Sequence, residues 1–466
     1  MVAAASGERS QHAPIEESCP STSFISTDLS SWAVEPATPT REDTRAKAGW
    51  CDSCRPGLAQ VLTSTDRNLP PRLRRPRYRA LLGMSKRAVF WGSVTVLVYV
   101  YAGFPLLVAA RALVRNRPIA AGDGLPSVTV VIPAHNEADV IAGKLENVLS
   151  LGYPSERLEV IVASDGSDDG TNEIVRAHPA GIRLLPLPRV GKNAALNEAA
   201  AAARGEIVVF TDADAKMTEH ALHYLAAPFA DPEVGGVAGE RRHGDVARPK
   251  SLAAATRHWF RGLLSRSGSV TSAEGQIYAV RRELVQPAPA NVPDDFWIST
   301  RVVAAHSRLV YEPRAATYPL AGARRVHDPF ERKVRMTGPS LRALWLGREL
   351  LNPRVYGFYA LQLLSHKLLR RLVFVPVVGL AVTATALSSH GRVYRLAALA
   401  QGGLHGAALA GLLLRGTRLG RLKALRAALA FDLSNAAAAA ALAQQLRGRR
   451  PRDDMWEPQR APRTDS

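Results

Sequence analysis

The chain has 466 residues, of which 47% are hydrophobic, a length sufficient for two or three domains with buried cores. It carries 60 Lys+Arg against 41 Asp+Glu, a formal net charge of +19. The basic residues form no recognisable nucleic-acid-binding motif and aromatic residues make up only 6%, which argues against a nucleic-acid partner. All three cysteines precede residue 85, so a disulfide framework and a catalytic cysteine are excluded for the rest of the chain.

Residues 1–85 are rich in Ser, Pro, Thr, Ala and Arg and show no sustained hydrophobic period. Such a segment cannot bury enough apolar surface to offset the entropy lost on ordering, so we predict a disordered tail. Met84 begins a short basic head that leads into an apolar run. That pattern is typical of a natural start, which would leave the tail untranslated.

Residues 88–114 form an apolar run whose single charge is Arg111. About 20 apolar residues suffice to cross a bilayer. The run is too long for the core of a signal peptide and lacks a small-residue cleavage site. The sequence therefore predicts a transmembrane helix over residues 86–116.

Between residues 126 and 320, short β-branched runs alternate with helical stretches. The runs are "SVTVVIPAHNE", "LEVIVASDGS", "GIRLLPLP" and "EIVVFTDAD". This alternation predicts an α/β domain in which helices cover a parallel sheet. Polar residues follow the strands directly, and open α/β sheets bind ligands at the carboxyl ends of their strands.

The remainder of the chain is basic and then apolar. Residues 321–371 contain 11 Lys/Arg and 3 Asp/Glu, which predicts a basic segment with interfacial helices. Residues 372–446 hold apolar runs that predict about three transmembrane helices, followed by a tail at 447–466. The connector "RGTRLGRLKALR" favours the cytoplasmic side. We therefore expect a multi-pass protein of the cell membrane with its α/β domain in the cytoplasm.

Two acids directly follow the fourth run: Asp212 and Asp214, in "TDAD". Carboxylates this close repel one another, and a hard divalent cation such as Mg²⁺ or Mn²⁺ relieves the repulsion. Such a cation, shared with phosphate oxygens, would neutralise a diphosphate. A solvated turn that holds no metal is the alternative.

Further polar residues lie at other strand ends and helix starts. Asp165, in "SDGSDDGT", could accept hydrogen bonds from a base or sugar, or belong to a capped strand-to-helix loop. Glu137, in "PAHNE", follows the first strand. Lys192 lies at a helix start, where a cation favours anionic groups, although a surface lysine is the simpler interpretation.

A second acid pair, Asp294 and Asp295 in "VPDDFWIST", lies at a predicted helix start. The pair could act as a double N-cap, or one of its members could be a general base whose pKa is raised by its neighbour. "FERKVRM" supplies Arg332, Lys333 and Arg335 close to the proposed interfacial helices. This cluster is either a basic juxtamembrane face or a clamp on a leaving diphosphate.

Together, the ordered motifs resemble the membrane-bound family 2 glycosyltransferases, which include hyaluronan, chitin, cellulose and poly-N-acetylglucosamine synthases. The motifs are "VVIPAHNEADVI", "VIVASDGSDDGT", "GKNAALNEA", "VVFTDADA", "GQIYAVRRE" and "DDFWISTRV". The resemblance extends over residues 88–456 and includes "DMWEPQR". It implies a GT-A domain with flanking transmembrane helices (one before, about three after), a nucleotide-diphosphate sugar donor, expected to be a UDP-sugar, Mg²⁺ or Mn²⁺, and inversion at the anomeric carbon.

The resemblance also implies roles for individual residues. Asp165 would hold the nucleobase or ribose region, while Glu137 and Lys192 would line the nucleotide pocket. Asp212 would face the nucleotide sugar, and Asp214 would hold the metal on the diphosphate.

On the acceptor side, the resemblance implies that Asp295 is the base, with Asp294 as the second candidate. Gly275 and Gln276 would lie near a glycan or lipid acceptor. The expected partners are thus the donor, this acceptor and the lipid bilayer, without nucleic acid.

The motif set departs from the family at one place. Processive members carry Gln-x-x-Arg-Trp after the base, whereas here Glu331 replaces the glutamine and no tryptophan follows Arg335, the best candidate for a diphosphate contact. Polymer synthesis and transfer of one or a few sugars therefore both stay open. An inactive domain that binds a nucleotide sugar and regulates a membrane complex is the alternative, against which the full set of carboxylates argues. A nucleotidyltransferase would need a basic, glycine-rich loop where "PAHNEAD" stands.

Overall fold

A computed structural model describes residues 76–120, 122, 124–242, 252–320 and 329–447. The described part belongs to one compact unit that begins at Arg74. The residues outside this description include most of the expected tail at 1–85, residues 243–251, the start of the expected basic segment at 321–328 and nearly all of the expected tail at 447–466.

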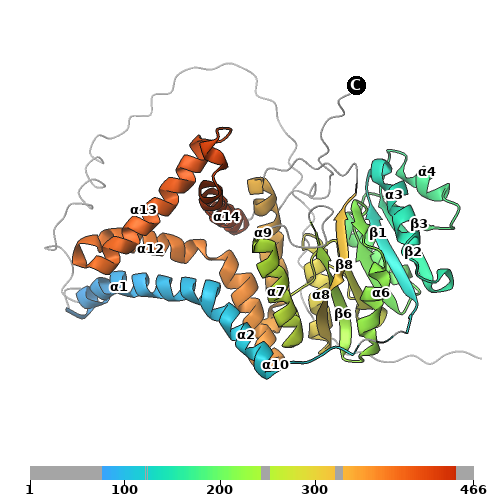
Figure 1. Cartoon of the computed structure of the whole chain (residues 1–466), viewed down its shortest axis with the longest axis horizontal. Coiled ribbons are helices and arrows are strands. Elements are labelled where there is room, and N and C mark those ends of the chain that lie inside the picture. Colours follow the sequence, from blue (N-terminus) through green and yellow to red (C-terminus); the bar gives the residue numbers. More distant parts are fainter. Residues whose placement is uncertain (1–75, 121, 123, 243–251, 321–328, 448–466) are drawn as a thin grey trace, which may run out of the picture. The chain divides into compact units, whose positions relative to one another are not determined.

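The catalytic-domain candidate is built on one eight-stranded sheet in the order β3-β2-β1-β4-β7-β6-β8-β5 (Figure 1). Its strands are β1 (Val128–Ala134), β2 (Leu158–Asp165), β3 (Arg183–Leu187), β4 (Ile207–Thr211), β5 (Ala215–Met217), β6 (Val234–Arg241), β7 (Ile277–Arg281) and β8 (Arg308–Pro319). The helices of this region are α3 (Ala138–Leu149), α4 (Thr171–Arg176), α5 (Lys192–Ala202), α6 (Ala221–Ala226), α7 (Leu252–Arg266) and α8 (Asp294–Ala304).

The expected parallel sheet is confirmed for the four strands that the sequence indicated. β1 pairs in parallel with β2 and with β4, and β2 pairs in parallel with β3. The other half is different, because β7 runs antiparallel to both β4 and β6, and β5 runs antiparallel to β8. The sheet is therefore mixed, and the α/β fold class stands.

The alternation of side chains along β1 divides the core into two layers. Val128, Val130 and Ile132 belong to the layer packed against α3 and α6, while Val131 belongs to the other layer. This is the period of two expected for a strand, and here both faces are covered, so every residue of β1 is buried. Figure 1 shows helices on both sides of the sheet.

The helices outside this domain are mostly long and apolar. They are α1 (Pro76–Val98), α2 (Phe104–Val114), α9 (Pro329–Leu346), α10 (Pro353–Tyr356), α11 (Phe358–Gln362), α12 (Phe374–Ala386), α13 (Arg392–Leu413) and α14 (Lys423–Leu446). Within the described residues, three helices are long and apolar enough to cross a membrane: Lys86–Val114, Arg392–Leu413 and Lys423–Gln445. A fourth candidate is the pair Phe358–Leu369 and Phe374–Ala386, which is bent by 61°.

Helix α1 begins at Pro76, earlier than the boundary expected at residue 86. Residues 76–85 are therefore helical and do not belong to a disordered tail. Proline is favoured at the first position of a helix, and no further proline or glycine interrupts the helix before Gly83, so the turn can propagate backwards from the apolar run.

The first candidate span shares a core with the sheet. Phe104 and Val108 of α2 are buried in the same cluster as Phe210 of β4 and Tyr278 of β7. The rings of Phe210 and Tyr278 stack with centroids 4.9 Å apart. Packing is therefore continuous from the candidate span to the layer beneath the strand ends.

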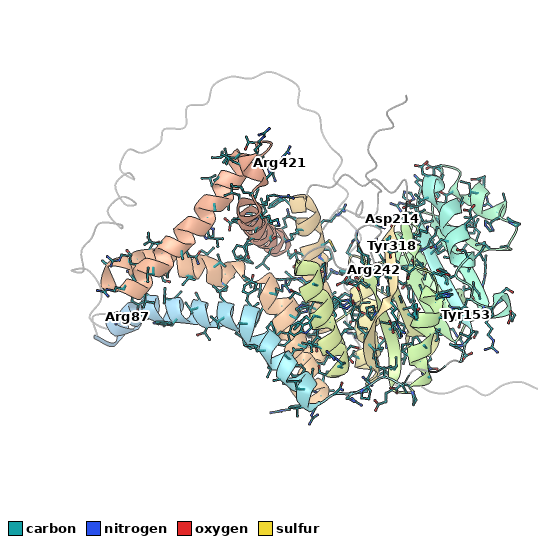
Figure 2. The ribbon with its side chains drawn as sticks, in the orientation of Figure 1. Arg87, Tyr153, Asp214, Arg242, Tyr318 and Arg421 are labelled. Carbon is teal, nitrogen blue, oxygen red and sulfur yellow. The ribbon has the colours of Figure 1, made fainter. Side chains whose placement is uncertain are left out.

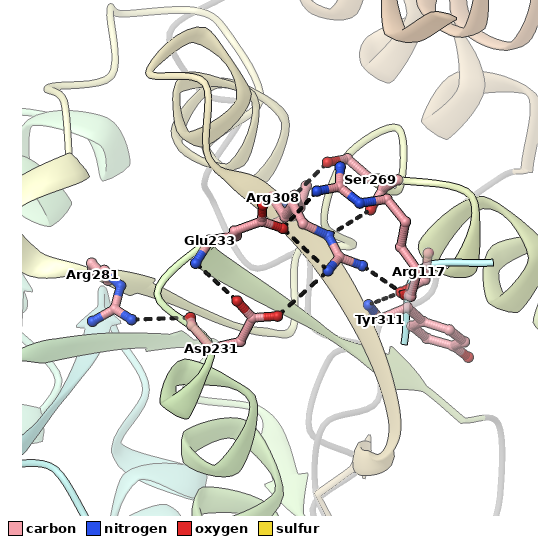
Figure 3. A network of polar contacts seen from close by, with 10 residues as sticks. Arg117, Asp231, Glu233, Ser269, Arg281, Arg308 and Tyr311 are labelled. Carbon is pink, nitrogen blue, oxygen red and sulfur yellow. Dashed lines mark hydrogen bonds and ion pairs between the residues drawn. The ribbon is translucent and has the colours of Figure 1, made fainter. Parts of the chain in front are cut away.

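Figure 3 shows a polar network that fastens the segment after α2 to the same domain. Arg308 Nη1 lies 3.5 Å from Asp231 Oδ2, and its Nη2 donates to the carbonyl of Arg117 at 3.0 Å. Arg117 in turn pairs with Glu233 at 2.6 Å. Because the side chains of Arg308 and Asp231 are largely buried, this network holds the linker more firmly than an exposed ion pair would.

Candidate active site

The acid pair Asp212 and Asp214 occupies the short turn between β4 and β5. Asp214 is 7% exposed, and its carbonyl accepts a hydrogen bond from the backbone N–H of Leu320 at 2.8 Å. Figure 2 labels Asp214 close to Tyr318 and Arg242, on the side where β8 ends. The turn is thereby fixed by pairing of β5 with β8, and the Asp212 side chain is partly open to solvent.

Lys192, the first residue of α5, bridges the two acid pairs. Its Nζ lies 3.0 Å from Asp212 Oδ1 and 3.2 Å from Asp294 Oδ1. Burial alone would lower the pKa of Lys192, but the negative charges of Asp212 and Asp294 outweigh it and hold the pKa above its ordinary value. This lysine therefore stays charged and joins the turn after β4 to the start of α8.

Asp294 and Asp295 form the first turn of α8. Asp295 Oδ1 accepts the backbone N–H of Phe296 at 2.8 Å. Burial, and then the adjacent charge of Asp294, raise the pKa of Asp295 to about 6, although Lys367 opposes the shift. A carboxylate of this kind is ionised at neutral pH yet basic enough to accept a proton, as a general base requires.

Gly275 lies directly against this carboxylate. A Cβ built on it would be 3.5 Å from Asp295 Oδ2. Gln276 is buried, and its Oε1 accepts from Thr317 Oγ1 at 3.4 Å. Of the two expected acceptor residues, Gly275 thus adjoins the candidate base, while Gln276 is fixed by β8.

Asp165, at the end of β2, is fully buried and engaged by the loop before α5. Its Oδ1 accepts the backbone N–H groups of Val190 at 2.6 Å and Gly191 at 2.9 Å, and its Oδ2 accepts from Arg189 at 2.5 Å. The carboxylate therefore positions the loop that delivers Lys192. Its expected contact with the nucleobase or ribose stays a prediction, with Arg189 and the loop backbone as its immediate surroundings.

Glu137 directly precedes α3 and follows a residue in the left-handed backbone region. Asn136 has φ 52°, a conformation that asparagine tolerates better than most residues. Its side-chain oxygen accepts the N–H of Asp168 at 3.0 Å, and the N–H of Glu137 donates to Thr171 Oγ1 at 2.9 Å. These hydrogen bonds connect the loop after β1 to the loop after β2, and Glu137 is buried.

Arg335 lies in α9 and is half-buried. Among the residues that the structure describes, no hydrogen bond or ion pair joins Arg335 to Asp212, Asp294 or Lys192. Its expected contact with a diphosphate stays a prediction.

Three residues near the acids did not emerge from sequence reasoning: Lys144, Tyr278 and Lys367. Lys144 is fully buried and donates to Thr211 Oγ1 at 2.8 Å and to the carbonyl of Ala215. Burial lowers the pKa of Lys144 to about 7, against the pull of Asp212 and Asp214. A signal existed, because helical periodicity places Lys144 on the same face of α3 as the apolar residues Val140, Ile141, Leu145 and Val148.

Tyr278 is also fully buried, and its stacking partner Phe210 immediately precedes the strand end. Burial first, then the charges of Asp294, Asp295 and Asp212, raise the pKa of Tyr278 well above its ordinary value. Lys367 donates to Ser272 Oγ at 2.7 Å and lies over the Phe296 ring. Tyr278 lies within the motif "GQIYAVRRE", in which only Gly275 and Gln276 were assigned a role, and Lys367 belongs to no quoted motif.

Within the described part of the chain, no three His, Cys, Asp or Glu side chains converge on one point. Two carboxylates at one turn are nevertheless the donor set with which Mg²⁺ or Mn²⁺ is held when substrate phosphates complete the coordination. Asp214 and Asp212 therefore fit a cation that arrives with a diphosphate better than one held by the protein alone.

Comparisons with known proteins agree with this geometry. A model of the glycosyl transferase family 2 matches residues 129–286. A probable glycosyltransferase, YdaM of Bacillus subtilis, is 30% identical over 212 residues, which are 42% of this chain and 50% of that protein. The poly-beta-1,6-N-acetyl-D-glucosamine synthase of Staphylococcus aureus is 28% identical over 226 residues (45% and 54%). The beta-monoglucosyldiacylglycerol synthase of Trichormus variabilis is 26% identical over 243 residues (48% and 52%). The chain thus spans about half the length of these relatives.

One solved structure is similar over a longer stretch. The mannosyltransferase PcManGT of Pyrobaculum calidifontis, in complex with GDP-Man and Mn²⁺, has a TM-score of 0.60 and 25% sequence identity. The match covers 78% of this chain and all of that one. It therefore extends beyond the family-model match into the helices that flank the sheet.

Proposed function

Because residues 129–286 form a family 2 glycosyltransferase domain of the GT-A fold, we propose that the protein moves a sugar from a nucleoside-diphosphate sugar to a membrane-associated acceptor. The observation that carries this proposal is the bridge of Lys192 between Asp212 and Asp294. It connects an acid pair suited to a donor diphosphate with an acid pair suited to an attacking hydroxyl.

On the donor side, Asp214 and Asp212 would hold the divalent cation. When bound, Mg²⁺ or Mn²⁺ supplies positive charge that offsets the negative charge growing on the departing diphosphate. Lys192 adds a positive charge next to these acids, and its ion pair with Asp212 holds its ammonium group at the end of β4. The GDP-Man and Mn²⁺ bound by the mannosyltransferase of Pyrobaculum calidifontis support this donor class, with both UDP- and GDP-sugars to be tested.

On the acceptor side, Asp295 removes the proton from a hydroxyl as its oxygen attacks the anomeric carbon from the face opposite the diphosphate. A single displacement of this kind inverts the anomeric configuration. The pKa of Asp295, near 6, lets it take up the proton at neutral pH and release it afterwards. Gly275 leaves room beside Oδ2 for the acceptor.

The proposed location is the cytoplasmic face of the cell membrane, in a multi-pass protein. In the part of the chain that the structure describes, three apolar helices, or four with the bent pair, are long enough to cross a bilayer. The basic connector between α13 and α14 supports a cytoplasmic position for that turn. The names of the relatives denote one polysaccharide and one glycolipid product, so a glycan and a lipid are both candidate acceptors.

A screen of membranes that contain the full chain tests the proposal. The membranes receive radiolabelled UDP- and GDP-sugars with Mn²⁺, Mg²⁺ or EDTA, and the product is extracted and sized. We expect metal-dependent label from one donor, and a loss of about 100-fold or more in Asp214→Asn. No incorporation from any of these donors, in membranes where the chain is folded, would contradict it.

The alternative, a nucleotide-sugar-binding regulator without turnover, gives a different result. The purified chain would then bind a donor, shown by calorimetry, yet neither hydrolyse nor transfer its sugar. The raised pKa of Asp295 favours the enzyme, because a domain that only binds its ligand has no need of a basic carboxylate beside an open position.

A further inference from the structure

A cavity of about 810 Å³ lies beside the candidate active site. Three segments far apart in the sequence enclose it: the start of α2, helix α7 and the π-helical segment Leu363–Leu369. Another part of its lining comes from the connection between α7 and β7: Val270, Thr271, Ser272 and Glu274. Since α2 belongs to the candidate span Lys86–Val114, the cavity adjoins a helix suited to a bilayer.

The lining has two chemical characters. Val100 and Phe104 of the first candidate span and Phe260 and Leu264 of α7 provide an apolar wall. The remainder of the lining carries four cations, Arg257, Arg261, Lys367 and Arg370. Glu274 is the one acid among the lining residues that the structure describes. An apolar wall beside a basic one matches an amphiphile with an anionic headgroup, whereas a neutral glycan or neutral lipid would leave Glu274 as the single counter-charge that the described lining offers to four cations.

Arg261 is the most informative of these cations. It is 6% exposed, and its Nη1 lies 3.4 Å from Glu274 Oε2. Its Nη2 is buried and has no hydrogen-bond partner among the described residues. A buried guanidinium nitrogen without an acceptor is costly, so a ligand oxygen at this point would satisfy it. Neighbouring Lys367 uses one donor on Ser272 and carries two more.

The lining of the cavity lies next to the candidate base. Glu274, which lines it, is followed by Gly275, and a Cβ on Gly275 would lie 3.5 Å from Asp295 Oδ2. Lys367, which also lines the cavity, is close enough to Asp295 for its charge to oppose the raised pKa of that carboxylate.

We propose that this cavity binds a membrane lipid whose headgroup carries a phosphate and a hydroxyl, and that this lipid is the acceptor. The role as acceptor rests on the proposed function, but the binding does not. The phosphate pairs with Arg257 and Arg261, and the tail lies along the first candidate span. In the transfer, the headgroup hydroxyl oxygen bonds to the anomeric carbon, the bond from that carbon to the diphosphate oxygen breaks with its electron pair, and the hydroxyl proton passes to Asp295.

Three probes distinguish the contributions of the tail and of the charged headgroup. Dioctanoyl phosphatidylglycerol has both, dioctanoylglycerol has the tails without the charge, and glycerol 3-phosphate has the charge without the tails. Each is titrated, without any donor, against the full chain in phosphatidylcholine nanodiscs. We expect the phosphatidylglycerol to bind about tenfold or more tightly than either of the other two, because only it offers both the charge and the tail.

Two exposed arginines of α7 make a matched pair for this measurement, since Arg257 lines the cavity and Arg266 does not. Arg257→Gln should weaken phosphatidylglycerol binding about tenfold, and Arg266→Gln should leave it within about twofold. Arg261→Gln should also weaken it. Because Arg261 also packs over the Tyr311 ring, the thermal midpoint of the Arg261→Gln variant is measured as well, to detect a loss of stability.

Several outcomes would overturn the proposal. Equal binding of dioctanoylglycerol would indicate a neutral lipid, and equal binding of glycerol 3-phosphate would indicate a soluble phosphate ligand. If Arg257→Gln instead weakened nucleotide-sugar binding, the cations would belong to the donor. Lipid binding without any sugar transfer would contradict the proposed function and leave the lipid site in place, so the two failures are distinguishable.

Discussion

The α-carbon of Gly275 faces the carboxylate of Asp295 so closely that a Cβ there would lie 3.5 Å from Oδ2. This separation is ordinary van der Waals contact, so an alanine fits without moving the base. The added methyl group would, however, occupy the space next to the oxygen that receives the acceptor's proton.

Gly275→Ala should therefore lower kcat/KM for the acceptor by about 10- to 100-fold while donor affinity stays unchanged, because only the attacking group is displaced. Steady-state kinetics with varied acceptor, together with calorimetry of donor binding, measure this. Gly262→Ala is the control, since nothing lies within 4 Å of a Cβ at that position of α7. Equal activity of the two variants would remove Gly275 from the acceptor site.

Asp295→Asn should reduce transfer by about 10²–10⁴-fold with donor affinity nearly unchanged, because the amide cannot take up the proton. The protein should also be as stable as the parent, or more so, at pH 7.5. The raised pKa of Asp295 means that its ionised form is disfavoured in the folded state, and the substitution removes that charge. Thermal midpoints at pH 7.5 measure the second effect; near-normal turnover would discard Asp295 as the base.

Transfer should depend on pH through the same group. A base works only when deprotonated, so kcat/KM should fall as pH drops through about 6, the raised pKa of Asp295, and level off above it. The stability contribution of this group has the opposite sign, since protonation favours the folded state: it is present at low pH and is lost as pH rises through about 6. A rate that stays flat from pH 7.5 down to pH 5 would exclude this assignment.

Lys192→Gln should weaken donor binding about tenfold or more, because Asp212 and Asp294 would then face the diphosphate without their shared cation. Calorimetric titration with the nucleoside diphosphate and Mn²⁺ measures the loss. Lys216→Gln serves as the control, as Lys216 is an exposed lysine of β5 close to Asp214 in the sequence. Donor binding that survives in Lys192→Gln would make this residue a structural bridge alone.

A polar pair joins two of the candidate spans and gives a prediction independent of catalysis. His405 Nδ1 of α13 lies 2.9 Å from Asp432 Oδ2 of α14, and its Nε2 lies 2.8 Å from Gln401 Oε1. Ionisable groups in apolar spans are costly unless they are paired. A double-mutant cycle of His405→Leu and Asp432→Leu should yield a coupling of about 1 kcal/mol from unfolding in detergent. Additive effects would show that the two side chains do not stabilise each other.

Much of the parallel half of the sheet could be predicted from the sequence. Its β-branched runs, such as "EIVVFTDAD", end in polar residues and are separated by stretches that suit helices. The family resemblance, and not the strand pattern, implied that Asp212, Lys192 and Asp294 share a site, and in the structure Lys192 lies within ion-pair distance of both acids. The antiparallel β7 was missed because its residues, "IYAVR", carry no turn signal to a neighbouring strand. Strand direction there depends on tertiary pairing.

The rest depends on packing between distant segments. The ligand contact of Asp165 stays a prediction, but no local pattern in the sequence foretells that the loop after β3 donates hydrogen bonds to its carboxylate. The only sequence signal for Lys144 is its position on the apolar face of a helix. The cavity beside Glu274 needs α2, α7 and the π-helical segment together, so no stretch of sequence contains it.

The shared core of Phe104 and Val108 with Phe210 and Tyr278 has a practical consequence. A fragment that begins at residue 126 would lack Phe104 and Val108 and would expose the apolar surface that these side chains cover. Such a fragment should therefore aggregate in buffer without detergent. Detergent or bilayer thickness, by changing how the first helix is seated, would also disturb the aromatic stack under the acids. For the membrane position proposed above, lipid composition is therefore an experimental variable that affects the chemistry.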